Sequence, residues 1–285
     1  LHERGVRRLA AVRPRPAGVL MVAERVPDPS VATRDPARRR VERAMGTMIS
    51  LYLPQGGATS DAADAAFAWL HEVDDRFSPY QPESEVSRII AGEVSVEQAS
   101  SDLSEVLDIA EAVEVLSGGA FDIRGFRPDG RPDPTGVVKG WSVDRAAAIL
   151  AAGGIERFFF SAGGDVLVRG GLEWGVPWKV GIANPFAPDA VALVLQADDL
   201  AVATSGTTER GRHITDPHSG KPADELLTVT VVGPDLARAD AYATAAFAMG
   251  LDGLRWIDSL PGYYAVGIGH DARLITTRGL DRLRP

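Results

Sequence analysis

The pair of residues that could most directly do chemistry is Asp240 and Thr244, in the segment ARADAYATAAFAMG at residues 237–250. Residues four apart on a helix lie on one face, so a carboxylate and a hydroxyl would meet there. Such an oxygen-only corner suits Mg²⁺, which takes one or two carboxylates and leaves positions for substrate phosphates. A plain structural role also fits, with an acidic residue near the helix start and a threonine bonded back along the helix.

A second segment, PDPTGVVKGWSVDR at residues 132–145, combines two glycines with a lysine. Gly136 and Gly140 would let the backbone approach a ligand closely, and Lys139 places an ammonium near an expected helix start. This combination is typical of phosphate binding. The spacing of a Walker P-loop is absent, and a glycine turn with a solvated lysine remains an equal alternative.

The third segment is the polar stretch TSGTTERGRHITDPHSGKP at residues 204–222, which contains His213. Loops held by a rigid scaffold are where functional sites concentrate. A single histidine is nevertheless more often structural than catalytic. The turn Ala162-Gly163-Gly164-Asp165 favours a simple hairpin over a phosphate loop.

The elements that must position these segments alternate irregularly. Helices are predicted at 60–77, 101–116, 144–152 and 236–249, and a Gly/Pro-rich loop at 122–136. Strands are predicted at 44–53, 157–160, 165–168, 178–182, 190–196, 200–204, 227–232, 264–269 and 274–276. Because helices and strands do not alternate strictly, the pattern predicts an α+β fold with mixed, largely antiparallel sheets and packed helices.

Composition excludes several classes of protein. Hydrophobic residues make up 45% and charged residues 24% of the 285 residues, as in ordinary globular proteins. The apolar run at 17–23 is too short to cross a bilayer, so no membrane span is expected. The chain has no cysteine, so a metal would need oxygen or histidine ligands.

The N-terminal stretch differs from the rest of the chain. Residues 1–43 hold eleven arginines against five acidic residues, although the whole chain has a net charge of −9. The stretch lacks interleaved aromatic residues, so we expect a basic, flexible leader at 1–43 rather than a nucleic-acid-binding arm. The remaining residues, 44–285, would form one catalytic domain.

Eight segments occur in the order and spacing of one known family, and the chain resembles the ApbE-like FAD:protein FMN transferases over about residues 44–280. The segments are MGT (45–47), DDRFSPYQPESEVSR (74–88), GGAFD (118–122), DPTGVVKGWSVDRA (133–146), SAGGDV (161–166), ATSG (203–206), HITDPHSG (213–220) and ADAYAT (239–244).

The resemblance implies an ApbE-like (T-fold-like) α+β architecture and an enzyme of protein flavinylation. Such an enzyme moves the FMN moiety of FAD onto a Thr or Ser hydroxyl of a target flavoprotein, forms a phosphoester and releases AMP. Its metal would be Mg²⁺, held by Asp240, Thr244 and the backbone carbonyl of Gly136. The residues implied for the FAD site are Met45, Tyr80, Ala120, Phe121, Asp122, Asp133, Lys139 and Ile214.

The expected catalytic residues are Asp240, Lys139 and His213. Asp240 would hold the metal, Lys139 would add a positive contact to the phosphates, and His213 is our hypothesis for the base that accepts the target hydroxyl's proton. With neither an export signal nor a lipid-modified cysteine evident, we expect a cytoplasmic location. Two alternatives remain: an FAD pyrophosphatase that gives FMN and AMP, and a non-catalytic FAD-binding protein.

Overall fold

The computed structural model of the chain describes residues 6–8, 35–124, 133–207, 214–217 and 219–285. Its framework is one sheet of nine strands in which every neighbouring pair is antiparallel. In spatial order the strands are β1 (Val6–Arg8), β13 (Arg273–Thr276), β12 (Tyr264–Gly269), β11 (Leu226–Gly233), β8 (Leu200–Gly206), β5 (Asp165–Arg169), β4 (Phe158–Ala162), β3 (Thr47–Tyr52) and β2 (Arg39–Ala44).

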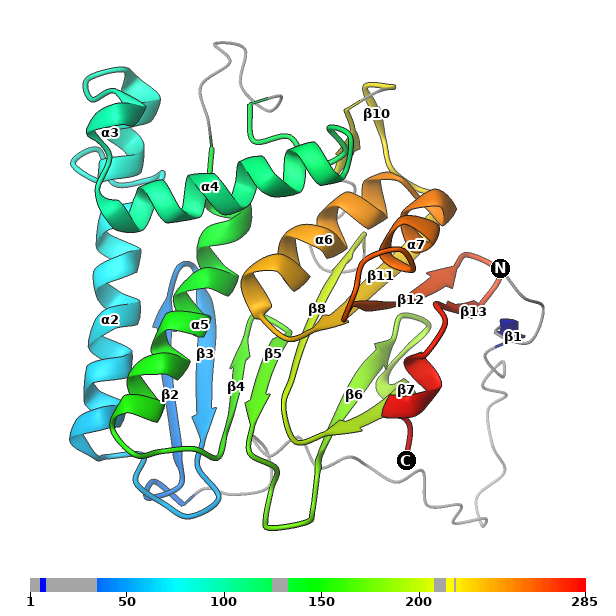
Figure 1. Cartoon of the computed structure of the whole chain (residues 1–285), viewed down its shortest axis with the longest axis horizontal. Coiled ribbons are helices and arrows are strands. Elements are labelled where there is room, and N and C mark those ends of the chain that lie inside the picture. The colour runs from blue at the N-terminus through cyan, green and yellow to red at the C-terminus, as the bar shows by residue number, and fades with distance from the viewer. Residues whose placement is uncertain (1–5, 9–34, 125–132, 208–213, 218) are drawn as a thin grey trace.

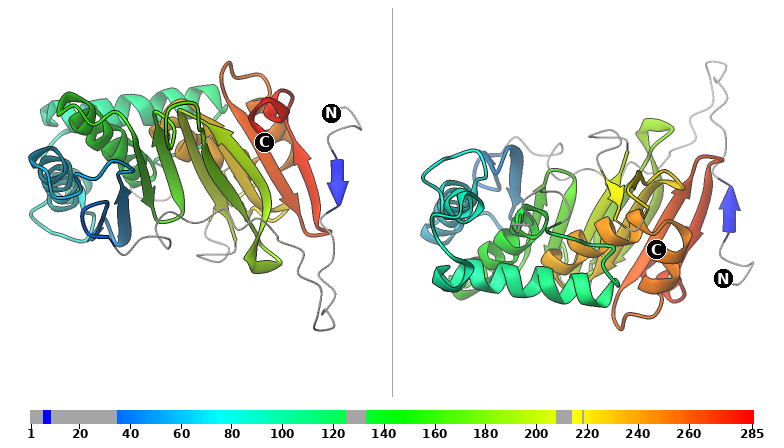
Figure 2. Two further views of the ribbon diagram at one scale, coloured as in Figure 1. Left: turned by 90° about the horizontal axis from the view of Figure 1, so that it is seen from below. Right: turned by 90° about the horizontal axis from the view of Figure 1, so that it is seen from above.

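Helices cover one face of this sheet, and a two-stranded hairpin covers part of the other (Figures 1 and 2). The helices are α2 (Asp61–Phe77), α3 (Glu85–Ala91), α4 (Ser101–Leu116), α5 (Thr135–Ala152), α6 (Leu236–Ala248) and α7 (Leu251–Ile257), with 3₁₀ turns η2 (Val96–Gln98) and η3 (Leu280–Leu283). The hairpin is β6 (Trp178–Asn184) with β7 (Ala187–Ala197), and a smaller hairpin joins β9 (Thr215–Asp216) to β10 (Lys221–Pro222).

Alternating side chains on the strands build two separate cores. Phe158 and Phe160 point into the core between the sheet and the helices, whereas Phe159 between them belongs to the core under the β6–β7 hairpin. There its ring meets that of Trp178 edge to face, with 5.8 Å between centroids. Successive residues of a strand face opposite sides, so a sheet covered on both faces can be apolar at every position.

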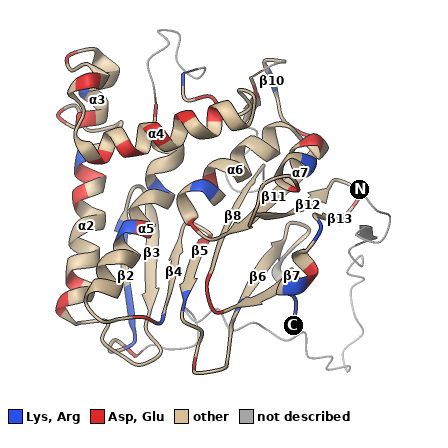
Figure 3. Cartoon of the chain, in the orientation of Figure 1, with Lys and Arg blue, Asp and Glu red and all other residues tan. Residues whose placement is uncertain are grey.

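Negative charge gathers on the outer helices. The five acidic residues of α4 stand on a helix without lysine or arginine (Figure 3); they are Asp102, Glu105, Asp108, Glu111 and Glu114. Some of them pair with arginines of neighbouring elements, such as Arg76 and Arg145. Within the described part of the chain, no helix is long and apolar enough to span a bilayer.

The α+β prediction with a largely antiparallel sheet is confirmed. The stretch predicted as one strand at 44–53 holds instead a tight turn and β3, because Met45 and Gly46 both have positive φ, 51° and 71°. A two-residue turn of this kind connects antiparallel strands whose twist it matches.

The structure corrects the start of one helix. The helix expected at 144–152 begins nine residues earlier, at Thr135. Its first turns contain Gly136 and Gly140, which disfavour a helix in isolation, and packing against α2 and α6 overrides that propensity. Lys139 therefore lies within α5 rather than before a helix.

The N-terminal stretch contributes to the sheet. β1 lies within the predicted leader, and so does β2 except for Ala44, its last residue. The sequence gives little sign of β2 because three of its six residues are arginines, a composition that suits the edge strand it forms. Arg40 of β2 packs over the ring of Phe67 and pairs with Asp64 of α2. The division of the chain at residue 43 stays a prediction.

Candidate functional site

Two hairpin tips form the base of the candidate site. The β2–β3 tip at Met45-Gly46 lies beside the β4–β5 tip at Gly163-Gly164, where both glycines have positive φ. A Cβ on Gly163 would lie 2.7 Å from the hydroxyl oxygen of Thr47, so the two tips pack without room for a side chain. This turn makes Asp165 the first residue of β5.

Asp165 is a buried carboxylate that links three elements. It is 3% exposed, and its Oδ1 accepts a hydrogen bond of 3.0 Å from the main-chain N–H of Thr204 on β8. Its Oδ2 contacts the ammonium of Lys139 on α5. A carboxylate this deep requires such partners, because burying an unpaired charge is costly.

The same ammonium reaches a second carboxylate. Lys139 Nζ lies 2.9 Å from Asp240 Oδ2 on α6, so one lysine bridges Asp165 and Asp240. The side chains of Lys139, Asp165 and Asp240 are 21%, 5% and 14% exposed, respectively. The three residues, called here the lysine bridge, therefore form a largely desolvated charge cluster with one excess negative charge.

Hydroxyl groups extend the lysine bridge along α6. Thr244 Oγ1 donates to the main-chain oxygen of Asp240 at 3.2 Å and lies 3.1 Å from Ser205 Oγ on β8. The Thr244 hydroxyl thus donates to the main-chain oxygen four residues earlier, as expected for a threonine within a helix. Its oxygen can still accept a hydrogen bond or bind a cation. Next to it, Thr204 Oγ1 and Thr230 Oγ1 lie 2.9 Å apart.

The oxygen-rich set defines what metal could bind. Across the described residues, no group of three or more His, Cys, Asp or Glu could hold a metal ion. A site at Asp240 and Thr244 would therefore combine one carboxylate with hydroxyl and carbonyl oxygens. Such a hard and incomplete set fits Mg²⁺, which keeps waters or substrate oxygens in its shell.

The N-terminus of α5 gathers several of the predicted flavin-site residues. A Cβ on Gly136 would lie 3.3 Å from the ring of Phe121, so the predicted backbone ligand sits beside the Ala120–Asp122 segment. Asp133 Oδ1 accepts from the main-chain N–H of Thr135 at 3.1 Å and from its hydroxyl at 2.7 Å. Asp133 thereby orders the first turn of the helix that carries Lys139.

Ala120, Phe121 and Asp122 differ in exposure. Ala120 and Phe121 are buried, and the main-chain N–H of Phe121 donates to Ser117 Oγ at 3.0 Å. Asp122 is partly exposed and accepts from the main-chain N–H of Arg124 at 2.7 Å. The segment is thus a fixed support with one carboxylate available at its edge.

Met45 also reaches α5. The hydroxyl of Ser142 donates to the main-chain oxygen of Lys139 at 2.8 Å and lies 3.4 Å from the sulfur of Met45. The structure therefore places five of the predicted site residues on or against the packed helices α5 and α6: Gly136 and Lys139 on α5, Asp240 and Thr244 on α6, and Met45 against Ser142 of α5.

Tyr80 and Ile214 form no hydrogen bond or ion pair with the lysine bridge in the described part of the chain. Tyr80 lies on the turn between α2 and α3 and is 91% exposed, which leaves its ring free to stack on a planar group. Ile214 is buried in the core on the helix side of the sheet. The predicted base, His213, lies outside the described residues.

Sequence reasoning missed Asp165, Ser205, Thr204 and Thr230. The segment Ala162–Asp165 was correctly expected to be a hairpin turn. The available signal was the acidic residue itself, because an aspartate directly before the apolar residues Val166–Val168 of a strand is disfavoured unless it has a partner. That partner, Lys139, is distant in sequence.

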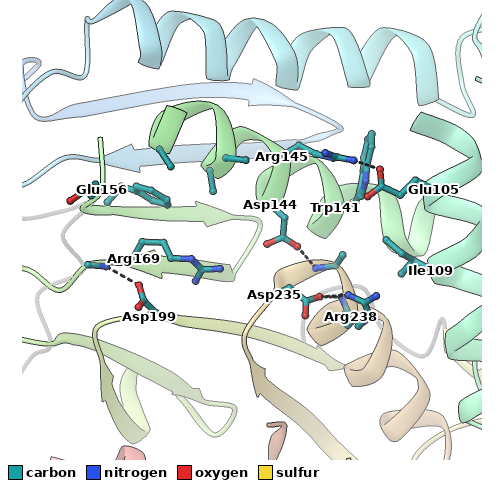
Figure 4. Close-up of a pocket in the computed structure, with 16 residues that line it drawn as sticks. Glu105, Ile109, Trp141, Asp144, Arg145, Glu156, Arg169, Asp199, Asp235 and Arg238 are labelled. Carbon is teal, nitrogen blue, oxygen red and sulfur yellow. Dashed lines mark hydrogen bonds and ion pairs between the residues drawn. The ribbon is translucent and has the colours of Figure 1, made fainter. Parts of the chain in front are cut away.

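A hollow of about 580 Å³ lies elsewhere, between α5, the start of α6 and the sheet (Figure 4). None of the predicted site residues lines it. Its central polar group is Asp144, whose carboxylate accepts from the main-chain N–H groups of Leu236 at 3.0 Å and Ala237 at 2.8 Å. Burial raises the pKa of Asp144 from 3.8 to about 6. The hollow and the lysine bridge are separate features of one helix pair.

Gly140 explains how the two helices come so close. A Cβ at this position would lie 2.6 Å from the main-chain oxygen of Leu236 and 2.8 Å from Cα of Ala237. Helices approach each other this closely only where a side chain is missing. Gly140, which we expected to approach a ligand, instead allows α6 to pack closely against α5. Lys139 is the residue before it in the sequence.

Several known proteins are similar to this chain in sequence or in fold. The chain is 29% identical over 238 residues to the FAD:protein FMN transferase of Vibrio cholerae, covering 64% of this chain and 71% of that protein. It is 32% identical over 133 residues to the FAD:protein FMN transferase of Escherichia coli K12, covering 43% of this chain but only 38% of that protein.

Solved structures show the same fold. The ApbE protein of Thermotoga maritima superposes with a TM-score of 0.74 at 23% identity, over 87% of this chain and 99% of that chain. The flavin transferase ApbE from Vibrio cholerae also gives 0.74 at 23% identity, over 87% of this chain and 100% of that one. The ApbE family model matches residues 45–125 and 127–266, and the chain therefore belongs to the ApbE family.

Proposed function

We propose that this chain is a Mg²⁺-dependent FAD:protein FMN transferase that modifies a Thr or Ser of a target flavoprotein. The hydroxyl oxygen of the target would form a new bond to the FMN phosphorus. The bond between that phosphorus and the AMP oxygen would break, and AMP would leave. Family membership and the names of the curated relatives support the reaction type.

The observation that carries the proposal is the meeting of Lys139, Asp240 and Thr244 at one place on two helices. Cleavage of a pyrophosphate requires positive charge near the phosphates and a metal ligand set that leaves positions open. A lysine, a carboxylate and a hydroxyl supply these features together. A protein that only stored FAD would not require a metal-binding corner.

The donor set fits the proposed metal. Asp240, Thr244 and the carbonyl of Gly136 would hold Mg²⁺, whose charge would stabilise the phosphates during attack and departure of AMP. Lys139 would place its ammonium against the same phosphates. Asp165, fixed by the N–H of Thr204, would orient that ammonium.

The flavin is proposed to extend from the lysine bridge toward the N-terminus of α5. In this proposal Met45, Ala120, Phe121, Asp122 and Asp133 would line the flavin, and the ring of Tyr80, which is exposed, would stack on a planar part of it. Ile214 would contribute an apolar wall. His213 remains our proposed base, which would accept the proton of the target hydroxyl near neutral pH.

Mass spectrometry of a candidate acceptor protein, incubated with this chain, FAD and Mg²⁺, tests the proposal. We expect a covalent FMN adduct that requires Mg²⁺ and disappears with Asp240→Ala. Asp252→Ala is the matched control, because Asp252 is an exposed acidic residue on α7 that pairs with Arg255. Free FMN and AMP without an adduct would favour the pyrophosphatase alternative, and intact bound FAD would indicate a non-catalytic carrier.

The role of His213 has its own test. His213→Ala should lower adduct formation while FAD still binds, because a base acts on the target hydroxyl and not on the flavin. Equal loss of binding and transfer would contradict the assignment. Fluorescence quenching of FAD on binding measures the first quantity, and the yield of the adduct measures the second.

A further inference from the structure

The lysine bridge places a positive charge on the carboxylate that the proposed function assigns to the metal. Lys139 Nζ lies 2.9 Å from Asp240 Oδ2 and also contacts Asp165. We propose that Lys139 is the counter-cation of Asp240 when no metal is bound, and that a divalent cation must displace its ammonium toward Asp165. The inference rests on the proposed function, since it concerns the same carboxylate.

The two carboxylates of the bridge are held very differently. Asp165 is fixed from two sides, by the N–H of Thr204 at 3.0 Å and by Lys139, and its side chain is 5% exposed. Asp240 is more exposed, and its partner in the lysine bridge is the ammonium of Lys139. Asp165 is therefore a permanent partner for the lysine, while Asp240 is a partner that can be exchanged.

Because Asp165 and Asp240 are poorly hydrated, Lys139 and a metal ion cannot both lie close to Asp240. Two carboxylates that share a poorly hydrated space repel each other, and a lysine between them offsets this repulsion. A divalent cation at Asp240 would supply the same compensation more strongly. The ammonium and the metal would then repel each other at one carboxylate, so both cannot hold it closely. Lys139 has a flexible stem, and Asp165 provides a place for its charge nearby.

The arrangement predicts that metal and FAD assist each other's binding. The pyrophosphate of FAD is anionic and would attract both the displaced ammonium and the metal, which relieves their repulsion. Without FAD, the metal must compete with Lys139 unaided. Coupling of this kind is reciprocal, so FAD should tighten metal binding by the same factor as the metal tightens FAD binding.

Calorimetry of Mn²⁺ binding to the whole chain without FAD tests the competition directly. We expect Lys139→Met to bind Mn²⁺ about tenfold more tightly than the wild type, because a competing cation is removed. Lys179→Met is the matched control: Lys179 is an exposed lysine on β6, in a different sheet, and its change should leave the affinity unaltered. Equal or weaker binding by a folded Lys139→Met protein would overturn the proposal.

A second variant tests the part assigned to Asp165. Asp165→Asn keeps an acceptor for the N–H of Thr204 but removes the charge that draws the ammonium away from Asp240. We expect weaker Mn²⁺ binding in this variant, and a smaller loss when Lys139→Met is already present. If Asp165→Asn lowers the affinity for Mn²⁺ equally in the wild type and in Lys139→Met, Asp165 does not act through Lys139.

The outcomes also separate this inference from the proposed function. If FAD and Mn²⁺ bind normally but Lys139→Met leaves their coupling and the metal affinity unchanged, the competition is refuted and the transferase proposal stands. If Mn²⁺ binds neither protein at any FAD concentration, both fail. Thermal melting checks that each variant is folded, and Lys139→Gln replaces Lys139→Met if the latter is not.

Discussion

Two carboxylates beside the α5–α6 pair, Asp165 on β5 and Asp144 on α5, are stabilised in different ways. Asp165 combines one main-chain N–H with the ammonium of Lys139. Asp144 accepts from two main-chain N–H groups at the start of α6 (Figure 4). The positive charge of Arg169 also acts to lower the pKa of Asp144, but less strongly than burial raises it. Asp165 is thus in direct contact with a full positive charge, whereas the direct partners of Asp144 are the N–H groups of a helix end.

The difference has a measurable consequence. A helix N-terminus carries only about half an elementary charge, so it compensates a buried carboxylate incompletely. Burial accordingly raises the pKa of Asp144 to about 6, despite its hydrogen bonds to Leu236 and Ala237. Asp144 therefore serves to hold α6 on α5, whereas Asp165 holds a side chain that the proposed reaction uses.

Asp165→Ala should produce the largest effect on stability. It leaves the N–H of Thr204 without its acceptor and removes one partner of Lys139 in a poorly solvated place. We expect the free energy of unfolding to fall by about 3 to 4 kcal/mol. Chemical denaturation at neutral pH measures the change. Asp165→Asn, which keeps the acceptor, should lose clearly less, and equal losses would mean that the charge contributes everything.

Asp144 should instead appear in the pH dependence of stability. Its folded pKa is raised from 3.8 to about 6, so the folded state binds the proton more tightly than the unfolded state does. This contribution is fully present below about pH 4 and is lost as the pH rises through 6, a decrease of at most about 3 kcal/mol.

Asp144→Asn is the matching variant. It should lack that pH-dependent decrease, so the stability difference between wild type and variant should shift in favour of the variant between pH 4 and 7. Denaturation curves collected at half-unit pH intervals provide the measurement. A constant difference across that range would refute the raised pKa and remove the contrast with Asp165.

The contact between the helices can be disturbed without touching either carboxylate. Gly140→Ala introduces a Cβ against the backbone of Leu236 and Ala237, which cannot move aside as a side chain could. We expect the free energy of unfolding to fall by about 2 kcal/mol, which chemical denaturation measures. Gly136→Ala meets only the edge of the Phe121 ring at 3.3 Å and should cost less.

The candidate residues that the sequence indicates lie in local patterns. Asp240 and Thr244 share one helix face, and the segment around Lys139 has its own glycine and lysine pattern. The lysine bridge could not be predicted in the same way, because Asp165 and Lys139 come from different segments of the chain. They meet only because β5 pairs with β8 in the sheet and α5 packs close to β5. Local sequence patterns indicate which residues are candidates, but tertiary packing determines which carboxylate a lysine contacts.

The start of α5 illustrates the same limit. The sequence predicts a loop over 122–136 and a helix only from 144, and the glycines at 136 and 140 would weaken an isolated helix. The structure shows a helix from Thr135, and the close contact with α6 accounts for the glycine at 140 within it. Propensity was outweighed by an interaction with a helix about a hundred residues later in the chain.

The smallest predicted effect concerns Asp235, the N-cap of α6, which lies at the same helix end as Asp144. Asp235 Oδ1 accepts from the main-chain N–H of Arg238 at 3.0 Å, and its Oδ2 accepts from the hydroxyl of Tyr263 at 2.6 Å. Asp235→Ala should lower the free energy of unfolding by about 1 kcal/mol, as the loss of an N-cap usually does.

Because Asp144 and Asp235 bind different N–H groups of one helix end, their effects should be coupled. Once Asp144→Asn has weakened the start of α6, less ordered structure remains for Asp235 to stabilise. The double variant should therefore lose less than the sum of the two single losses, which a double-mutant cycle by denaturation resolves. Strict additivity would mean that the two carboxylates act on independent structures, and Asp144 would then hold α5 and α6 together no more than a local cap does.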